Sequence, residues 1–220
     1  MRVSSDHHSS EQPGNRTSDH WRAATATRLL STTLLPKQLR LCYAIDMTSY
    51  ERIFDFAIEN YGLITTTQAK TLGIAPARLA DLAHRGRLMQ IGHSVYQLTH
   101  YLPTPNDAYA QAVALVGHGA YLHGESVVAL LGLAPTNPDR MYVAAFGRVR
   151  RNLGMGIVIC KANAADAPAP IEGIPAQSVC RALLSARNTM PESRIVEAAA
   201  EARRQGRIDQ AEMEIIVHGK

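Results

Sequence analysis

The residues best able to do chemistry are arginines, hydroxyls and amides gathered between positions 65 and 93. The guanidinium group of Arg78 can bond guanine O6 and N7 together, and Arg85 lies two helical turns further along. Threonine hydroxyls and glutamine amides suit phosphate oxygens. These residue types predict contacts with double-stranded DNA, with Arg78 as the expected reader of a base edge. The predicted contact residues are Thr65, Thr66, Thr67, Gln68, Ala77, Arg78, Asp81, His84, Arg85, Arg87, Gln90 and His93.

Two short helices joined by a turn that contains Gly73 would position these side chains. Residues 65–72 and 76–85 have helical spacing, and Pro76 suits the first helical position, where no N–H is needed. Residues 88–98 predict a β-hairpin. The pattern predicts a winged helix-turn-helix over residues 47–98, whose second short helix enters the groove. A preceding helix is expected to bury one face, made of Tyr50, Ile53, Phe54, Ala57, Ile58 and Tyr61.

The following residues predict a second domain of mixed α/β type over 107–220. The expected fold class is therefore α+β, with an N-terminal winged helix-turn-helix followed by this domain. Residues 141–146 and 157–161 are rich in β-branched or aromatic side chains and predict two strands of a hairpin, whereas 164–170 predict a loop. Helices are expected at 107–116 (burying Ala108, Ala112 and Leu115), 126–131, 178–186, 192–205 (burying Ile195, Ala198, Ala199 and Ala202) and 209–217.

The first 46 residues differ in composition from the rest. They are rich in Ser, Thr and Arg with few apolar clusters, and we expect a disordered extension. The composition becomes globular at Met47, which is a candidate for the true first residue. Two prolines within residues 101–105 indicate a linker. The expected division is therefore 1–46, 47–98 and 107–220.

The charge balance excludes DNA binding through bulk electrostatics. The 220 residues include 23 basic and 19 acidic side chains, a net charge of +4, so affinity must come from individually placed contacts. Cys42, Cys160 and Cys180 form no Cys-x-x-Cys pair, which argues against a disulfide framework or a zinc ribbon. No apolar run approaches the roughly 18 residues of a membrane span. We expect a cytoplasmic protein with no membrane partner.

Other candidate sites have weaker signals. His118, His123 and Glu125 are close in sequence, but their spacing matches no defined metal site and a turn explains them equally well. We expect the protein to bind no metal and no cofactor and to have no enzymatic activity, because no set of catalytic residues stands out. The enzymatic alternative is a nuclease that uses Glu125. A second basic patch, at the predicted hairpin tip, is either solvated or binds phosphates or an acidic partner. It comprises Arg148, Arg150 and Arg151.

Several motifs resemble one known family. The segment from Arg85-Gly86-Arg87-Leu88 to Val95-Tyr96-Gln97-Leu98 resembles the winged helix of AbiEi-type antitoxins, the transcriptional regulators of type IV toxin-antitoxin systems in abortive infection of bacteria by phage. The second domain resembles the same family at 121–126, 131–133, 173–178 and 181–184. The resemblance covers nearly all of residues 47–209. Relatives often have Thr and Asp where this chain has Ala182 and Ser185.

The resemblance implies a function for each domain. The N-terminal domain would bind inverted repeats in its own promoter and repress the operon. The C-terminal domain would help to counter a nucleotidyltransferase toxin, without necessarily forming a stable complex with it. The alternatives are an orphan winged-helix regulator and a protein-interaction module that uses the second basic patch.

Overall fold

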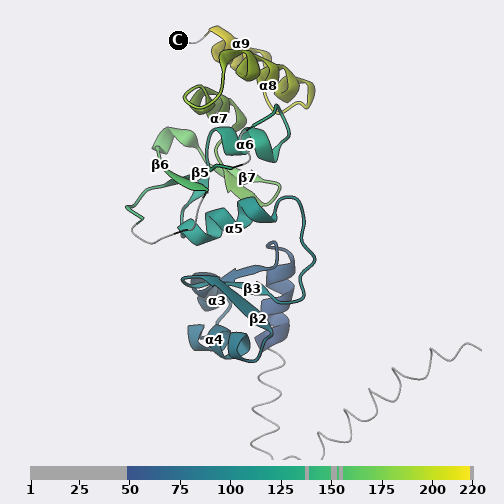
Figure 1. Ribbon diagram of the computed structural model, residues 1–220, viewed down its shortest axis with the longest axis vertical. Helices are drawn as coiled ribbons and strands as arrows, with labels where there is room; N and C mark the ends of the chain where they lie inside the picture. The colour runs from purple at the N-terminus through teal and green to yellow at the C-terminus, as the bar shows by residue number, and fades with distance from the viewer. Residues whose placement is uncertain (1–48, 137–138, 150–152, 154–155, 219–220) are drawn as a thin grey trace, which may run out of the picture. The chain divides into compact units, whose positions relative to one another are not determined.

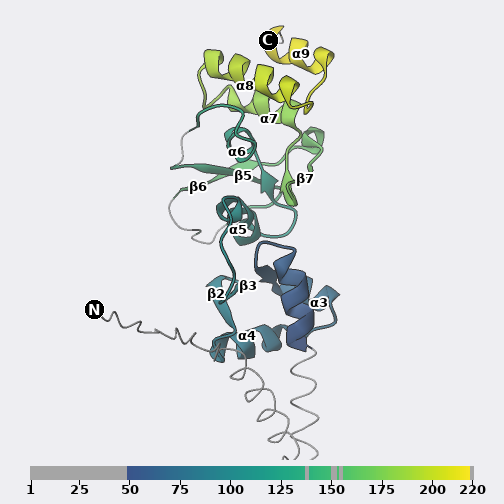
Figure 2. The same ribbon diagram turned by 90° about the vertical axis from the view of Figure 1, so that its right-hand side faces the viewer.

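The computed structural model describes residues 49–136, 139–149, 153 and 156–218 (Figures 1 and 2). These residues belong to one compact unit that begins at Ser49. They combine helices with two separate sheets, a mixed α+β arrangement. The predicted extension, together with Arg150 and Arg151, lies outside the described residues. No described helix is long and apolar enough to cross a membrane.

The first sheet has three antiparallel strands in the order β1-β3-β2. Residues 49–58 form a helix before it, and two short helices lie between its first two strands in the chain. Thr65 caps the first of these helices, and Pro76 is the first residue of the second. The two predicted short helices and the predicted hairpin are confirmed. The elements are β1 (Leu63–Thr65), α3 (Thr66–Thr71), α4 (Pro76–His84), β2 (Leu88–Gly92) and β3 (Val95–Leu98).

Apolar side chains of these elements form one core cluster, in which Ile53, Ala57 and Leu79 have no exposed surface. The predicted buried face of helix 49–58 is wrong in part. Phe54 and Ile58 remain 41% and 47% exposed. Successive helical residues rotate by about 100°, so a stripe centred on Ile53 and Ala57 leaves Phe54 and Ile58 at its side.

The second sheet has five strands in the order β6-β5-β4-β8-β7 (Figure 1). Its central strand β4 pairs antiparallel with β5 and parallel with β8. Strands β5 and β6 are parallel, so the predicted hairpin between them is wrong: the chain returns to the same end of the sheet before β6 begins. The strands are β4 (Tyr121–Leu122), β5 (Met141–Ala145), β6 (Ile157–Lys161), β7 (Ala169–Ile171) and β8 (Ile174–Ala176).

Helices cover both faces of this sheet. In both ribbon views α5 lies on one side and the group from α6 to α9 on the other (Figures 1 and 2). Val127 and Leu130 of α6 share one apolar cluster with α5, and a second cluster lies mainly among α7, α8 and α9. The helices are α5 (Asp107–Val116), α6 (Glu125–Leu130), η1 (Ala164–Asp166), α7 (Val179–Ala186), α8 (Glu192–Arg204) and α9 (Gln210–His218).

The buried faces of two helices test the sequence pattern directly. In α8 the predicted set of Ile195, Ala198, Ala199 and Ala202 is fully buried, which confirms that face. In α5 the predicted face is wrong in part: Ala112 is buried as expected, but Ala108 is exposed and Leu115 only partly buried, while Val113 and Val116 enter the core. The expected loop at 164–170 is also wrong, since it contains η1 and the start of β7.

The first sheet is joined to the second by packing as well as by the chain. Leu63 of β1 belongs to the apolar cluster that also contains Val113 of α5 and Ile174 of β8. A Cβ atom at Gly92 would overlap the Leu115 side chain. The Tyr61 hydroxyl donates a hydrogen bond to the Glu172 carbonyl.

Candidate nucleic-acid interface

Helix α4 carries the predicted base-reading residues on a firmly anchored support. Leu79 and Leu82 have no exposed surface and fix one side of the helix in the core. Ala77 and His84 are exposed on the other side. A small residue such as Ala77 permits the close approach that a helix makes in the major groove.

Asp81 brings the two arginines of α4 together. Arg78 Nη1 lies 2.6 Å from Asp81 Oδ2, and Arg85 Nε lies 3.2 Å from Asp81 Oδ1. The spacings of three and four residues place all three side chains on one helical surface. The Arg78 side chain is only 23% exposed and that of Arg85 50% exposed. Ion pairs that keep contact with solvent contribute only about 0.2–1 kcal/mol, so a phosphate or a base can compete with Asp81 for the guanidinium groups.

The predicted phosphate contacts at α3 have local partners. The Gln68 N–H donates to Thr65 Oγ1 at 3.2 Å, and Gln68 Oε1 accepts from the Thr65 N–H at 2.8 Å. This reciprocal capping box satisfies helix-end donors. Thr67 is exposed and Thr66 is half-buried. With His93 and residues of α5, these side chains line a cavity of about 510 Å³.

The junction of α4 with the hairpin holds Arg87 in place. Its guanidinium carbon lies 4.8 Å from the centre of the Tyr50 ring, a cation–π contact. Gln90 Nε2 donates to the Gly92 carbonyl at 3.2 Å, and His93 is exposed in the hairpin turn. The structure therefore distributes the predicted contacts over α4, the α3 cap and the hairpin.

Two side chains near these contacts were not predicted. Met89, on the hairpin beside Gln90, is 53% exposed. Its alternation with buried Leu88 along β2 is the signal that could have identified it. Arg52 donates to the Leu72 carbonyl in the turn between α3 and α4. Because this contact joins residues far apart in sequence, no local sequence pattern predicts it.

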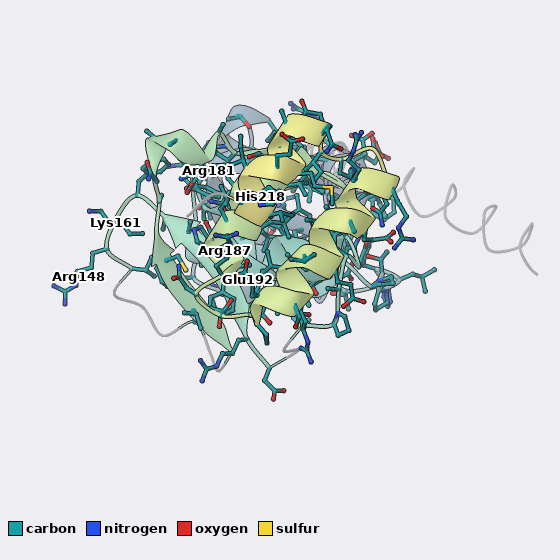
Figure 3. All side chains as sticks on the ribbon, turned by 90° about the horizontal axis from the view of Figure 1, so that it is seen from above. Arg148, Lys161, Arg181, Arg187, Glu192 and His218 are labelled. Atoms are coloured by element: carbon teal, nitrogen blue, oxygen red, sulfur yellow. The ribbon has the colours of Figure 1, made fainter. Side chains whose placement is uncertain are left out.

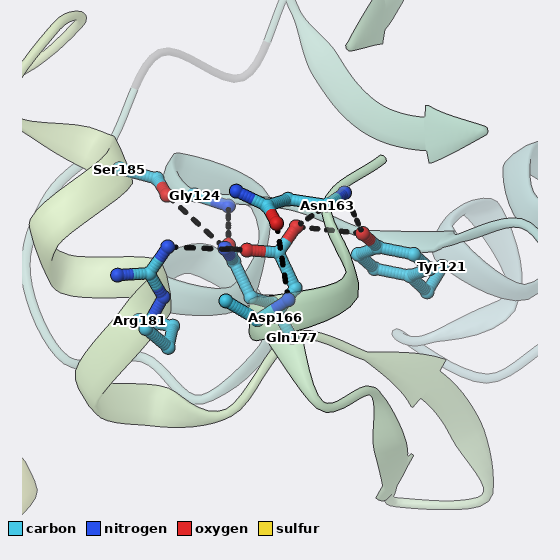
Figure 4. A network of polar contacts seen from close by, with 8 residues as sticks. Tyr121, Gly124, Asn163, Asp166, Gln177, Arg181 and Ser185 are labelled. Carbon is cyan, nitrogen blue, oxygen red and sulfur yellow. Dashed lines mark hydrogen bonds and ion pairs between the residues drawn. The ribbon is translucent and has the colours of Figure 1, made fainter. Parts of the chain in front are cut away.

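The second sheet contains a buried polar network around Asp166 (Figure 4). The Tyr121 hydroxyl donates to Asp166 Oδ2 at 2.6 Å, and Gln177 Nε2 donates to Oδ1 at 2.8 Å. Arg181 Nη2 lies 3.6 Å from Oδ1. The Gln177 amide also accepts from the Gly124 N–H at 3.0 Å. Asp166 and Gln177 are 2% and 0% exposed, so these bonds compensate for the burial of a carboxylate and an amide.

The network shifts the pKa values of its members. Burial acts to raise the pKa of Asp166, but hydrogen bonds from Tyr121, Gln177 and the Asn163 N–H outweigh it and hold this pKa below its ordinary value. Burial and the bond to Asp166 raise the pKa of Tyr121 to about 12. Burial lowers the pKa of His123. These shifts favour the ionised form of Asp166 and the neutral forms of Tyr121 and His123. We assign the network a structural role.

The second basic patch is only partly visible. Arg148 is exposed, and Figure 3 shows it and Lys161 pointing outward; Arg150 and Arg151 lie outside the described residues. His118 is exposed, His123 half-buried, and Glu125 5% exposed on α6. Within the ranges that the structure covers, no group of three His, Cys, Asp or Glu side chains could hold a metal ion.

The comparisons with known proteins bear on the first sheet and its helices. Residues 51–99 match a family model described as a transcriptional regulator, AbiEi antitoxin. The resemblance to that family is thereby confirmed for a segment that runs from helix 49–58 to the end of β3. No curated protein matches the chain.

Proposed function

From the match of residues 51–99 to AbiEi antitoxin transcriptional regulators, we propose that the chain is a sequence-specific DNA-binding repressor. Residues 49–98 act as a winged helix-turn-helix, with α4 in the major groove and the β2–β3 hairpin as the wing. The observation that carries the proposal is the pairing of Arg78 and Arg85 through Asp81 on the exposed side of α4. Two guanidinium groups held side by side suit a base edge and a neighbouring phosphate.

The wider role that we propose is that of an antitoxin in a type IV toxin-antitoxin pair. Two copies bind inverted repeats in the chain's own promoter, with half-sites about 10 bp apart or a multiple of that. The residues after 107 counter a nucleotidyltransferase toxin through function rather than through a stable complex. The protein acts in the cytoplasm, without catalysis and without a cofactor. A nucleotidyltransferase gene directly downstream would support this role, and its absence would favour an orphan regulator.

Binding to the chain's own upstream DNA is the direct test. A labelled duplex from that region should bind in fluorescence anisotropy about 10³-fold more tightly than a scrambled duplex of equal length. The logarithm of affinity should fall linearly with that of salt concentration. Equal affinity for both duplexes would leave the chain without a specific operator and refute the proposal.

Asp81→Asn should tighten DNA binding by about two- to tenfold, because it removes the carboxylate that competes for Arg78 and Arg85. The same anisotropy titration measures it. Asp55→Asn is the matched control, since it removes the same charge from an exposed position on helix 49–58. Weaker binding by Asp81→Asn would instead assign the carboxylate a direct contact with a base and contradict the competition.

A second candidate function is protein binding through the basic surface near Arg148. The exposure of Arg148 and Lys161 supports it. An acidic partner recovered by pull-down after nuclease treatment, and lost with Arg148→Glu, would favour this function over a purely DNA-binding role.

A further inference from the structure

Strand β6 forms an open edge of the five-stranded sheet (Figure 1). Within the described ranges it pairs only with β5. Its five residues, from Ile157 to Lys161, are mostly β-branched and none is buried. The opposite edge, β7, contains Pro170, which blocks the addition of a further strand. One edge of the sheet is therefore protected, whereas β6 keeps the features of a strand that accepts a partner.

The backbone groups of β6 divide into an inner and an outer set. The Gly156 carbonyl accepts from the Met141 N–H at 2.6 Å, and the Ala162 N–H donates to the Ala145 carbonyl at 3.1 Å. The backbone N–H and C=O groups of the even-numbered residues of β6 therefore point toward β5. Because the direction alternates along a strand, the N–H and C=O groups of Ile157, Ile159 and Lys161 point away from β5.

We propose that β6 pairs antiparallel with β6 of a second copy of this chain, about a two-fold axis at Ile159. This register places Ile159 opposite Ile159 of the second copy, and Ile157 opposite Lys161. Residues that face outward on one copy then meet residues that face outward on the other. Each pair exchanges two hydrogen bonds, so every outward backbone group from Ile157 to Lys161 finds a partner.

The side chains favour a second copy in this register. Ile159, 38% exposed, packs against its own equivalent on the axis. Lys161 of each copy lies opposite the apolar Ile157 of the other copy, so the two lysines are at opposite ends of the paired strands. A parallel, in-register pairing would instead place like charges of Lys161 together. The contact is smaller than the roughly 1,200 Å² of a stable interface, so we expect weak association that depends on protein concentration.

The register can be tested with a cysteine already present. Val158 and Cys160 of the two copies form the closely spaced pairs of the ladder, at Cα distances that fit a disulfide. Val158→Cys, in a full chain that also carries Cys42→Ser, should oxidise to a dimer on a non-reducing gel, and reductant should reverse it. Ile157→Cys in the same background is the control, because residue 157 lies opposite Lys161. Cross-linking by both variants, or none by Val158→Cys, would overturn the register.

Ile159→Lys tests the contact without oxidation, because it places two ammonium groups together on the axis. In analytical ultracentrifugation without DNA, the mass of the wild-type chain should rise above 24.0 kDa with concentration, whereas Ile159→Lys should remain a monomer. Ile215→Lys, at a 52% exposed position on α9, should behave as wild type. A wild-type chain that stays monomeric would leave this edge to a strand of another protein and overturn the proposal. Because no DNA is present, the result is independent of operator binding.

Discussion

Arg78→Ala should weaken binding to the operator by about 1–3 kcal/mol, or roughly 5- to 150-fold. Among the described residues of the first turn of α4, Arg78 is the one whose side chain can bond two base atoms at once, since its neighbours there are Pro76 and Ala77. Anisotropy titrations with operator and scrambled duplexes should show the loss mainly on the operator.

Two variants separate base reading from charge and from folding. Arg78→Lys keeps the charge but loses the planar fork, so it should keep most of its affinity for scrambled DNA while losing discrimination at one base pair. Arg194→Ala removes an exposed arginine from α8 and should leave both titrations unchanged. If Arg78→Ala and Arg85→Ala both bind the operator as the wild type does, the assignment of α4 as the reader is wrong.

Asp166→Asn should lower the free energy of unfolding by about 2–4 kcal/mol, because hydrogen bonds to a buried charged group are each worth about 1.5–3 kcal/mol. The new NH2 group would replace either the oxygen that accepts from Tyr121 or the one that accepts from Gln177, so a donor would face a donor at one of these two positions. Urea denaturation should show a lower midpoint with an unchanged slope. Glu197→Gln, an exposed change on α8, should stay within about 0.5 kcal/mol of wild type.

The pH dependence of stability gives a second measure of this network. The pKa of Asp166 is lower in the folded chain than the ordinary value of about 3.9. Its contribution is therefore complete above that value and is lost as pH falls through the folded pKa. Tyr121, with a pKa of about 12, has the opposite dependence: its contribution is lost as pH rises above about 10. Acid sensitivity that is equal in Asp166→Asn and wild type would contradict the role given to Asp166.

The sequence was most informative where a signal is local and repeated. Helix α8 spans several turns, and its apolar residues recur at helical spacing, so both its extent and its buried face were predictable. The strands β4 and β8 have two and three residues, too few for any alternation to be visible. The direction of β6 was missed because parallel and antiparallel neighbours depend on the path between them, not on the composition of either strand.

The candidate site divides in the same way. The spacing of Arg78, Asp81 and Arg85 is visible in the sequence. Because residues three and four apart meet on a helix, this spacing is sufficient to bring the ion-paired side chains together. The Asp166 network was not visible, because its members come from positions 121 to 181 and meet only when β4, η1 and α7 are assembled. Long-range partners of a buried carboxylate follow from topology, which residue types alone do not specify.

The packing of Leu63 limits how the protein can be dissected. This side chain lies in β1 yet is 4% exposed because α5 and β8 cover it. A fragment that ended in the proline-bearing stretch 101–105 would expose the Leu63 side chain next to the Thr65 cap, together with the face of Gly92 that Leu115 now covers. Truncation would therefore perturb the strand that precedes α3. Measurements of DNA recognition should accordingly use the intact chain, with point substitutions in place of excised pieces.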